Sequence, residues 1–278
     1  MLGIPTISYQ PAGDVDDEEL PPGELIQHLE DDVDGWWVSA ARRDGIIEVR
    51  IYDVATVWLD ETLAHCTVRP APEVGEGWLA FQLERHLLPI VRMVRGEAVF
   101  HAGAVHTAHD AVLLLADGQG GKSTTTALLV AEGAGFISDD QTGVTADCAA
   151  IGTPWLRLRP PSAGLAPPGC ETRLDGDGRI VVELQPRSTP APIAGLLLLG
   201  GRSDTGTVTL EPLEGATAVA ALLAQVFCGG LVDPVLVERH FTVAADLAAT
   251  LPVARLRVPH GPPWPRVLPP IETWLQRR

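Results

Sequence analysis

The most informative stretch of this 278-residue chain is Ala116-Asp117-Gly118-Gln119-Gly120-Gly121-Lys122-Ser123. It fits the pattern GxxxxGK followed by Ser or Thr, with alanine at the position of the first glycine. Glycines allow successive backbone N–H groups to face one anion, and a helix that begins here adds the positive end of its dipole. The stretch therefore predicts a phosphate-binding loop.

The sequence on either side supplies the strand and the helix that such a loop requires. Ala111–Leu115 is a continuous apolar run of the kind found in buried strands. Ser123–Glu132 has the pattern of a helix that ends at Gly133, and Gly135–Ser138 has the pattern of another short strand. This order favours an α/β fold over a chance match in a glycine-rich loop.

Lys122 is the single lysine of the chain, against nineteen arginines, and the chain has no asparagine. GC-rich coding would explain the bias, yet the lysine stands where a compact ammonium fits better than a branched guanidinium. We expect Lys122 to contact the β and γ phosphates of a nucleotide and the Ser123 hydroxyl to ligate Mg²⁺. The expected nucleotide-binding residues are Asp117, Gly118, Gln119, Gly120, Gly121, Lys122, Ser123 and Thr124.

Two aspartates, Asp139 and Asp140, directly follow the expected strand Gly135–Ser138. Ligands of open α/β sheets bind at strand ends, where one carboxylate can hold a metal and the other can accept a hydroxyl proton. His101 lies on the expected strand Ala98–Val105 and can orient or tune a carboxylate. The alternatives are an ordinary acidic turn and a structural histidine.

These residues match a family pattern. The segment Phe100–Val144 resembles the catalytic domain of HPr serine kinase/phosphorylase, and more closely the short HPr-kinase-like proteins found with peptide-modification operons. The shared features are the histidine strand His101–Val105, the loop Gly118–Thr124 and the acidic pair 17 residues after Lys122. The resemblance extends less specifically over residues 36–258.

The resemblance implies an α/β fold, namely a mixed-sheet P-loop kinase of the phosphoenolpyruvate-carboxykinase/HPr kinase type. It implies ATP and Mg²⁺ as cofactors and transfer of the γ-phosphoryl group to a Ser/Thr hydroxyl of a peptide or small protein, such as a ribosomally made precursor. Asp139, His101 and Lys122 would be catalytic, while Ser123 and Asp140 would hold the metal. The pattern favours Asp139 as the base but leaves the choice between the two aspartates open.

The chain also departs from the bifunctional enzyme. It lacks the glycine/isoleucine-rich loop associated with phosphorylase activity within Gly143–Pro161, and it lacks the separate N-terminal domain. Phosphorylase activity and HPr itself as the substrate are therefore not implied. Arg157, Arg159 and Arg187 are candidates for binding phosphate or substrate, with a surface or structural role as the alternative.

Several other nucleotide-binding classes are excluded by missing residues. Without asparagine, the chain has neither the Asn-Lys-x-Asp motif of Ras-type GTPases nor the catalytic-loop asparagine of eukaryotic-type protein kinases. It lacks an LSGGQ-like segment of ABC ATPases and the second lysine of a carboxykinase. Two alternatives remain open, namely a kinase for a small hydroxylated metabolite and an ATP-binding regulator without catalysis.

The composition limits which binding partners and which cellular compartment we expect for the protein. The net charge of −16 and the pI of about 4.8 disfavour nucleic acid and anionic membranes. No apolar run reaches the roughly 18 residues of a membrane helix, and no signal-peptide pattern is visible. The cysteines Cys66, Cys148, Cys170 and Cys228 form no CxxC pair, which fits a reducing cytoplasm. The oligomeric state stays open.

The expected organisation is one catalytic domain over residues 25–278 behind an acidic flexible tail, 1–24, with a short helix at Glu24–Leu29. Within the domain we expect a β-rich part (25–97), a P-loop core (98–258) and a proline-rich tail (259–278). Further expected strands are Trp36–Val38, Ile46–Tyr52, Val54–Leu59, Leu156–Leu158, Ile193–Leu199, Thr207–Leu210 and Ala254–Val258, with a hairpin over Thr172–Leu184. Further expected helices are Leu79–Val94, Gly215–Phe227, Val235–Leu251 and Ile271–Gln276.

Overall fold

The computed structural model describes residues 5–14, 20–30, 37–60, 62–116, 120–175, 177–186, 189–203, 206–226, 230–259 and 263–277. The chain divides into two compact units. The N-terminal unit comprises Leu2–Gly96 and Cys228–Arg239, and the core unit comprises Glu97–Phe227 and His240–Arg278. All candidate site residues belong to the core unit.

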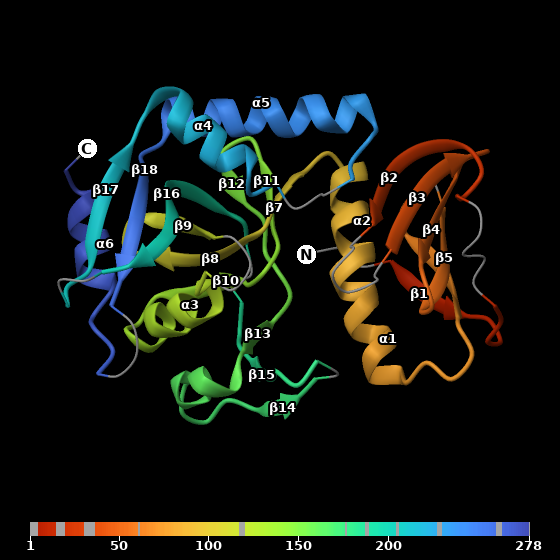
Figure 1. Cartoon of the computed structure of the whole chain (residues 1–278), viewed down its shortest axis with the longest axis horizontal. Coiled ribbons are helices and arrows are strands. Elements are labelled where there is room, and N and C mark those ends of the chain that lie inside the picture. The colour runs from red at the N-terminus through yellow and green to blue at the C-terminus, as the bar shows by residue number, and fades with distance from the viewer. Residues whose placement is uncertain are drawn as a thin grey trace. The chain divides into compact units, whose positions relative to one another are not determined.

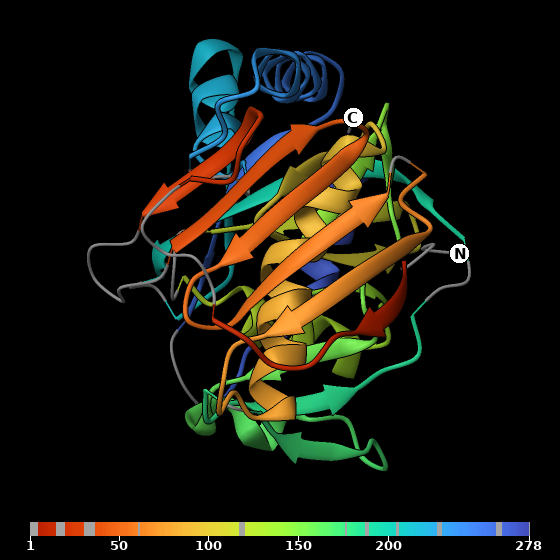
Figure 2. The same ribbon diagram turned by 90° about the vertical axis from the view of Figure 1, so that its right-hand side faces the viewer.

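The N-terminal unit is built on a curled six-stranded sheet in the order β1-β6-β5-β4-β3-β2 (Figure 2). The strands are β1 (Thr6–Tyr9), β2 (Glu24–Glu30), β3 (Trp37–Arg43), β4 (Ile46–Ile51), β5 (Ala55–Asp60) and β6 (His65–Pro70). β1 runs parallel to β6 and all other pairs are antiparallel. The expected strands of this part are confirmed over the described residues, with Trp36 lying outside them. β1 forms within the segment expected to be a tail.

The short helix expected at Glu24–Leu29 is wrong, because this segment forms strand β2. It pairs with β3 from Glu24 opposite Arg42 to Glu30 opposite Trp37. Ile26 is only 1% exposed, so pairing and burial in the sheet outweigh the weak local preference for a turn of helix.

The helix expected over Leu79–Val94 is confirmed as a continuous helical segment that crosses one face of the six-stranded sheet (Figure 2). It consists of α1 (Glu76–Gln82), a π-helical turn η1 (Leu83–Leu87) and α2 (Leu88–Val94). Pro89 lies in the first turn of α2, where it interrupts the segment least. The segment ends at Arg95 and Gly96, and Gly96 has a φ of 100°.

The core unit contains a nine-stranded sheet in which β10-β8-β9-β16-β12-β11-β7 follow one another and β18 joins β16 to β17 (Figure 1). Its strands are β7 (Ala98–Phe100), β8 (Ala102–Thr107), β9 (Asp110–Leu115), β10 (Gly135–Ser138), β11 (Thr142–Thr145), β12 (Cys148–Ala149), β16 (Ala191–Arg202), β17 (Thr209–Leu213) and β18 (Val253–Val258). β9 and β18 run parallel to β16, and the other pairs are antiparallel. The structure is therefore α/β with mixed sheets, as expected.

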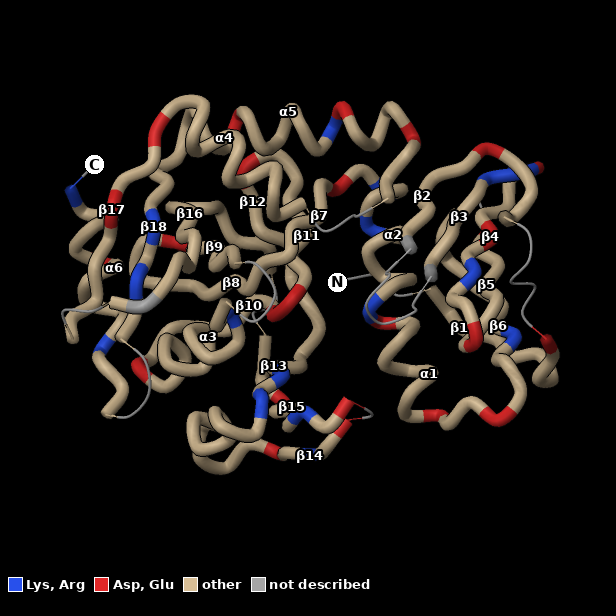
Figure 3. The backbone as a smooth tube through the Cα atoms, viewed as in Figure 1, with Lys and Arg blue, Asp and Glu red and all other residues tan. Residues whose placement is uncertain are grey.

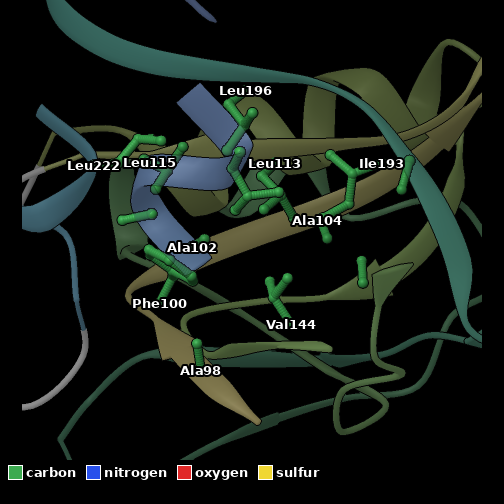
Figure 4. Close-up of a cluster of buried hydrophobic side chains, with 14 of the residues drawn as sticks. Ala98, Phe100, Ala102, Ala104, Leu113, Leu115, Val144, Ile193, Leu196 and Leu222 are labelled. Carbon is green, nitrogen blue, oxygen red and sulfur yellow. The ribbon is translucent and has the colours of Figure 1, made fainter. Parts of the chain in front are cut away.

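Helices cover both faces of this sheet. They are α3 (Lys122–Ala131), α4 (Gly215–Leu223), α5 (Pro234–Thr250), which enters the core unit at His240, and α6 (Leu268–Leu275). Alternate residues of β9 point to opposite sides, so Leu113 and Leu115 pack toward α4 and α5 (Figure 4) while Val112 and Leu114 pack toward α3 and α6. The expected helices are confirmed with ends shifted by a few residues. No helix among the described residues is long and apolar enough to cross a membrane.

The single strand expected over Ala98–Val105 is wrong in one respect, because it breaks at His101 into β7 and β8. β7 pairs with β11, whereas β8 lies between β9 and β10. At the break, the His101 backbone N–H donates to the Gln225 carbonyl at 2.8 Å. The histidine therefore stands where the chain passes from one part of the sheet to another.

A small three-stranded sheet, which we name the hairpin sheet, packs beside α3 (Figure 1). Its order is β13-β15-β14, from Trp155–Leu158, Ile180–Glu183 and Thr172–Leu174. The hairpin expected over Thr172–Leu184 is thus confirmed. Leu156, Leu158 and Val182 pack against Ala127 of α3 and Phe136 of β10. This packing places β13 next to the end of β10.

Candidate functional site

The glycine-rich stretch joins the end of β9 to the start of α3. Asp117, Gly118 and Gln119 lie outside the described residues. Gly121 precedes α3 with a φ of 90°, a left-handed conformation that favours glycine. The buried Lys122 side chain turns back so that its Nζ donates to the Ala116 carbonyl at 2.8 Å. The ammonium therefore lies across the strand end, beside the first turn of α3.

The topology brings this loop to the acidic pair. β8 is antiparallel to both β9 and β10, so β9 and β10 run in the same direction and end at the same edge. Ala116 follows β9 and Asp139 follows β10 at this edge. Two segments that are more than twenty residues apart in sequence thereby meet where ligands of α/β sheets bind.

Asp139 is the centre of the polar contacts. Its Oδ1 accepts a hydrogen bond from the Ser123 hydroxyl and its Oδ2 accepts one from the Arg157 backbone N–H, both at 3.1 Å. Burial, with Asp140 adjacent, raises the pKa of the Asp139 carboxyl to about 6, although these two hydrogen bonds and the Lys122 charge oppose the rise. Asp139 is only 7% exposed, so its carboxylate lies in the interior of the site.

Asp140 faces a different partner. Its Oδ1 lies 2.9 Å from the His101 Nε2, and both side chains are about one-third exposed. Asp140 has a φ of 66°, a left-handed conformation that is uncommon outside glycine. This turn directs the two neighbouring carboxylates to different partners. Asp140 and His101 are open to solvent, whereas Asp139 is closed.

Buried hydroxyl groups support this turn from behind. The Ser138 and Thr142 side chains are 2.6 Å apart, and the Thr142 hydroxyl donates to the Ala102 carbonyl at 2.8 Å. Ala102 follows His101, so the network joins the acidic turn to the strand that carries the histidine. A fully buried hydrogen-bonded network of this kind fixes the geometry of the residues it connects.

Gly103 on β8 lies between the loop and the acidic turn, and sequence reasoning did not single it out. A Cβ at this position would lie 2.7 Å from the Thr126 Oγ1 and 3.7 Å from the Asp139 Oδ1. The close approach of α3 to the sheet therefore requires glycine here. The signal in the sequence is a glycine inside an otherwise regular strand, which often marks such an approach.

The remaining expected residues contact other polar groups, are exposed, or lie outside the described residues. Thr124 contacts a residue that sequence reasoning missed, since its hydroxyl lies 3.0 Å from that of Ser162 in the short helix η2 (Pro160–Leu165). Arg157 reaches the site through its backbone amide, whereas Arg159 is exposed. Gly120 is exposed next to Gly121, and Arg187 lies outside the described residues.

The donor set fits a magnesium ion. Ser123, Asp139 and Asp140 offer only oxygen ligands, which Mg²⁺ prefers. Within the described residues, no three His, Cys, Asp or Glu side chains gather as a metal cluster. Mg²⁺ in proteins usually keeps several waters and takes only one or two carboxylates beside substrate phosphates.

The chain matches no family model and no curated protein sequence.

Proposed function

We propose that the protein is a Mg²⁺- and ATP-dependent kinase on a P-loop fold of the phosphoenolpyruvate-carboxykinase/HPr kinase type. It transfers the γ-phosphoryl group to a Ser/Thr hydroxyl of a peptide or small protein. The observation that supports this most is the shared edge of the sheet, where the Ser123–Asp139 hydrogen bond joins the glycine-rich loop to the acidic turn. The adjacent His101–Asp140 pair adds a proton acceptor.

Nucleotide binding falls to the loop and the first turn of α3. The backbone N–H groups of the loop and the positive end of α3 attract the phosphates, and Lys122 contacts the β and γ phosphates. Ser123 and Asp139 would hold Mg²⁺, because their oxygens already share a hydrogen bond within the buried part of the site. When bound, Mg²⁺ neutralises charge on the phosphate oxygens.

Proton transfer falls to the exposed pair. The pattern in the sequence favoured Asp139 as the base, but the geometry supports the reverse division, with Asp140 as the base and Asp139 as the metal ligand. Asp140 is open to an incoming hydroxyl, and His101 orients it. The hydroxyl oxygen attacks the γ phosphorus, the bond to the β-phosphate oxygen breaks, ADP leaves, and Asp140 receives the hydroxyl proton.

The test is transfer from ATP labelled in its γ-phosphoryl group to a library of serine- and threonine-containing peptides. Asp140→Asn should reduce transfer by about 10²–10⁴-fold, the usual contribution of a general base, while Mg-ADP binding measured by calorimetry persists. Asp147→Asn, at an exposed turn of the same unit, is the matched control and should transfer normally. An Asp140→Asn protein with wild-type turnover would contradict Asp140 as the base. A wild-type protein that binds Mg-ADP but transfers no phosphoryl group to any acceptor would leave an ATP-binding regulator as the better description.

A further inference from the structure

Arg157 contacts the candidate site through its backbone, and its side chain carries a positive charge. Its backbone N–H donates to the Asp139 Oδ2, so its Cα stands at the edge of the site. Leu156 and Leu158, its neighbours on β13, point into the core against α3. Because side chains alternate along a strand, the Arg157 side chain projects from the opposite face of the hairpin sheet.

The guanidinium rests on an acidic partner in the hairpin turn. The Arg157 Nε lies 3.4 Å from the Asp175 Oδ2, and the two side chains are only 11% and 3% exposed. Within the described part of the chain, the Asp175 Oδ2 accepts no hydrogen bond. A buried ion pair of this quality gains little net stability, because desolvation offsets its attraction. Stability alone is therefore a weak reason for this pair.

The turn does not depend on Arg157 for its own hydrogen bonds. The Asp175 Oδ1 accepts the backbone N–H groups of Arg179 at 2.9 Å and of Asp177 at 3.3 Å. The Asp175 carboxylate can therefore stay in place when the guanidinium moves away.

The neighbouring arginines of the hairpin sheet have other partners. Arg179 pairs with Asp177 at 2.9 Å, and Arg173 stacks on the Trp155 ring at 5.1 Å. Figure 3 shows basic and acidic segments close together around β13, β14 and β15. Of these three arginines, Arg157 is the one whose backbone is bonded to Asp139.

The charge of the site calls for a further cation. The Lys122 charge acts on the Asp139 carboxylate, and a second carboxylate, Asp140, is adjacent before any phosphate arrives. A triphosphate adds several negative charges, of which Mg²⁺ offsets two. Arginine is suited to this task, since its planar fork donates two parallel hydrogen bonds to a phosphoryl group.

We propose that Arg157 is a catalytic residue of the phosphoryl transfer, whose guanidinium leaves Asp175 and donates hydrogen bonds to the transferring phosphoryl group. This inference rests on the proposed function. Arg157 makes and breaks no covalent bond and donates only hydrogen bonds. Asp175 holds the guanidinium in the absence of nucleotide. An arginine in this role typically contributes 10³–10⁵-fold to kcat.

The experiment compares Mg-ADP binding with and without aluminium fluoride, which mimics the transferring phosphoryl group, by calorimetry. In the wild-type protein aluminium fluoride should tighten ADP binding by about 10²-fold or more, as transition-state analogues do. Arg157→Gln should lose most of this tightening while its affinity for Mg-ADP alone stays within about 3-fold. Arg179→Gln removes a comparable guanidinium from the same hairpin. Aluminium fluoride should tighten its ADP binding as much as it does for the wild type.

The outcomes separate the inference from the proposed function. A wild-type protein that binds no Mg-ADP, or shows no tightening, overturns the proposed function and the inference with it. Tightening in the wild type and equally in Arg157→Gln overturns the inference alone.

A thermal melt checks that Arg157→Gln is folded, and Asp175→Asn gives a second measurement that leaves Arg157 intact. Asp175→Asn frees the Arg157 guanidinium, and aluminium fluoride should still tighten ADP binding in this variant. Loss of tightening in Asp175→Asn would show that the pair acts only as a structural support and would contradict the role of Arg157.

Discussion

At the scale of single residues, the site holds two adjacent carboxylates in different environments. Asp139 is closed and bonded to Ser123 and an amide, whereas Asp140 is one-third exposed beside His101. The left-handed turn at Asp140 produces this division, because it rotates the second side chain away from the first. The proposed roles of metal ligand for Asp139 and base for Asp140 rest on this difference.

Asp139→Asn should change how stability depends on pH. The pKa of Asp139 is about 6 in the folded protein against an ordinary 3.8, so its protonated form stabilises the fold below pH 4. This stability is lost as the pH rises through 6. Asparagine does not ionise, so the unfolding free energy of the variant relative to wild type should grow by about 2–3 kcal/mol from pH 4 to pH 8.

Urea unfolding of the ligand-free protein at several pH values measures this change, and Asp147→Asn is the exposed control. A pH-independent difference between Asp139→Asn and the wild type would show that the carboxyl is not perturbed by burial.

Gly103→Ala should destabilise the core unit by about 1–3 kcal/mol, because its Cβ would press on the Thr126 hydroxyl. That hydroxyl is buried and has no hydrogen-bond partner among the described residues. Removing it in the double variant Gly103→Ala/Thr126→Ala should restore most of the loss. Chemical denaturation of the four proteins forms a double-mutant cycle, and strict additivity would rule out the contact.

At the scale of elements, a distant carboxylate holds the start of α6. The Glu132 side chain, just after α3, accepts the backbone N–H groups of Val267 at 2.7 Å and Leu268 at 3.1 Å. A carboxylate at a helix N-terminus satisfies unpaired donors and interacts favourably with the helix dipole. Glu132 therefore connects α6 to the end of the helix that carries the glycine-rich loop.

Glu132→Gln should lower the unfolding free energy by about 1–2 kcal/mol, because the amide loses the charge and turns one N–H group toward another donor. Thermal unfolding followed by circular dichroism measures the loss. Glu171→Gln, at an exposed position, is the control and should be neutral. A melting temperature equal to that of the wild type would show that the helix start does not need the carboxylate.

At the scale of the whole molecule, the chain enters the N-terminal unit twice. Residues 228–239 return to it after the core unit has begun, and Gln27 and Leu231 form a bridge within it. The described residues of the candidate site belong entirely to the core unit. Stability of one unit and ligand binding by the other can therefore be measured separately.

Leu59→Ala should test this separation. Leu59 is fully buried on β5, so the cavity should cost about 2–5 kcal/mol of unfolding free energy. We expect Mg-ADP affinity by calorimetry to stay within about 3-fold at a temperature where the variant is folded. A large loss of affinity in the folded variant would show that the two units are coupled.

The residues that the structure brings together at the candidate site could be named from the sequence. Lys122, Ser123 and the acidic pair stand at spacings that a strand, a loop and a helix impose, and the apolar run Ala111–Leu115 marks the buried strand before them. Local patterns also predicted most strands and helices of both units. They failed at Glu24–Leu29, where pairing with β3 decides the conformation.

The tertiary structure alone decided which groups surround the two aspartates. Three of these groups come from separate segments: the Arg157 amide on β13, Gly103 on β8, which lacks a Cβ, and the Asp175 carboxylate in the hairpin turn. No spacing along the chain relates them. Motif spacing reports only interactions between neighbours in sequence. Contacts between distant segments depend on how the sheet closes and how the hairpin sheet packs on α3, and these result from burial summed over many side chains.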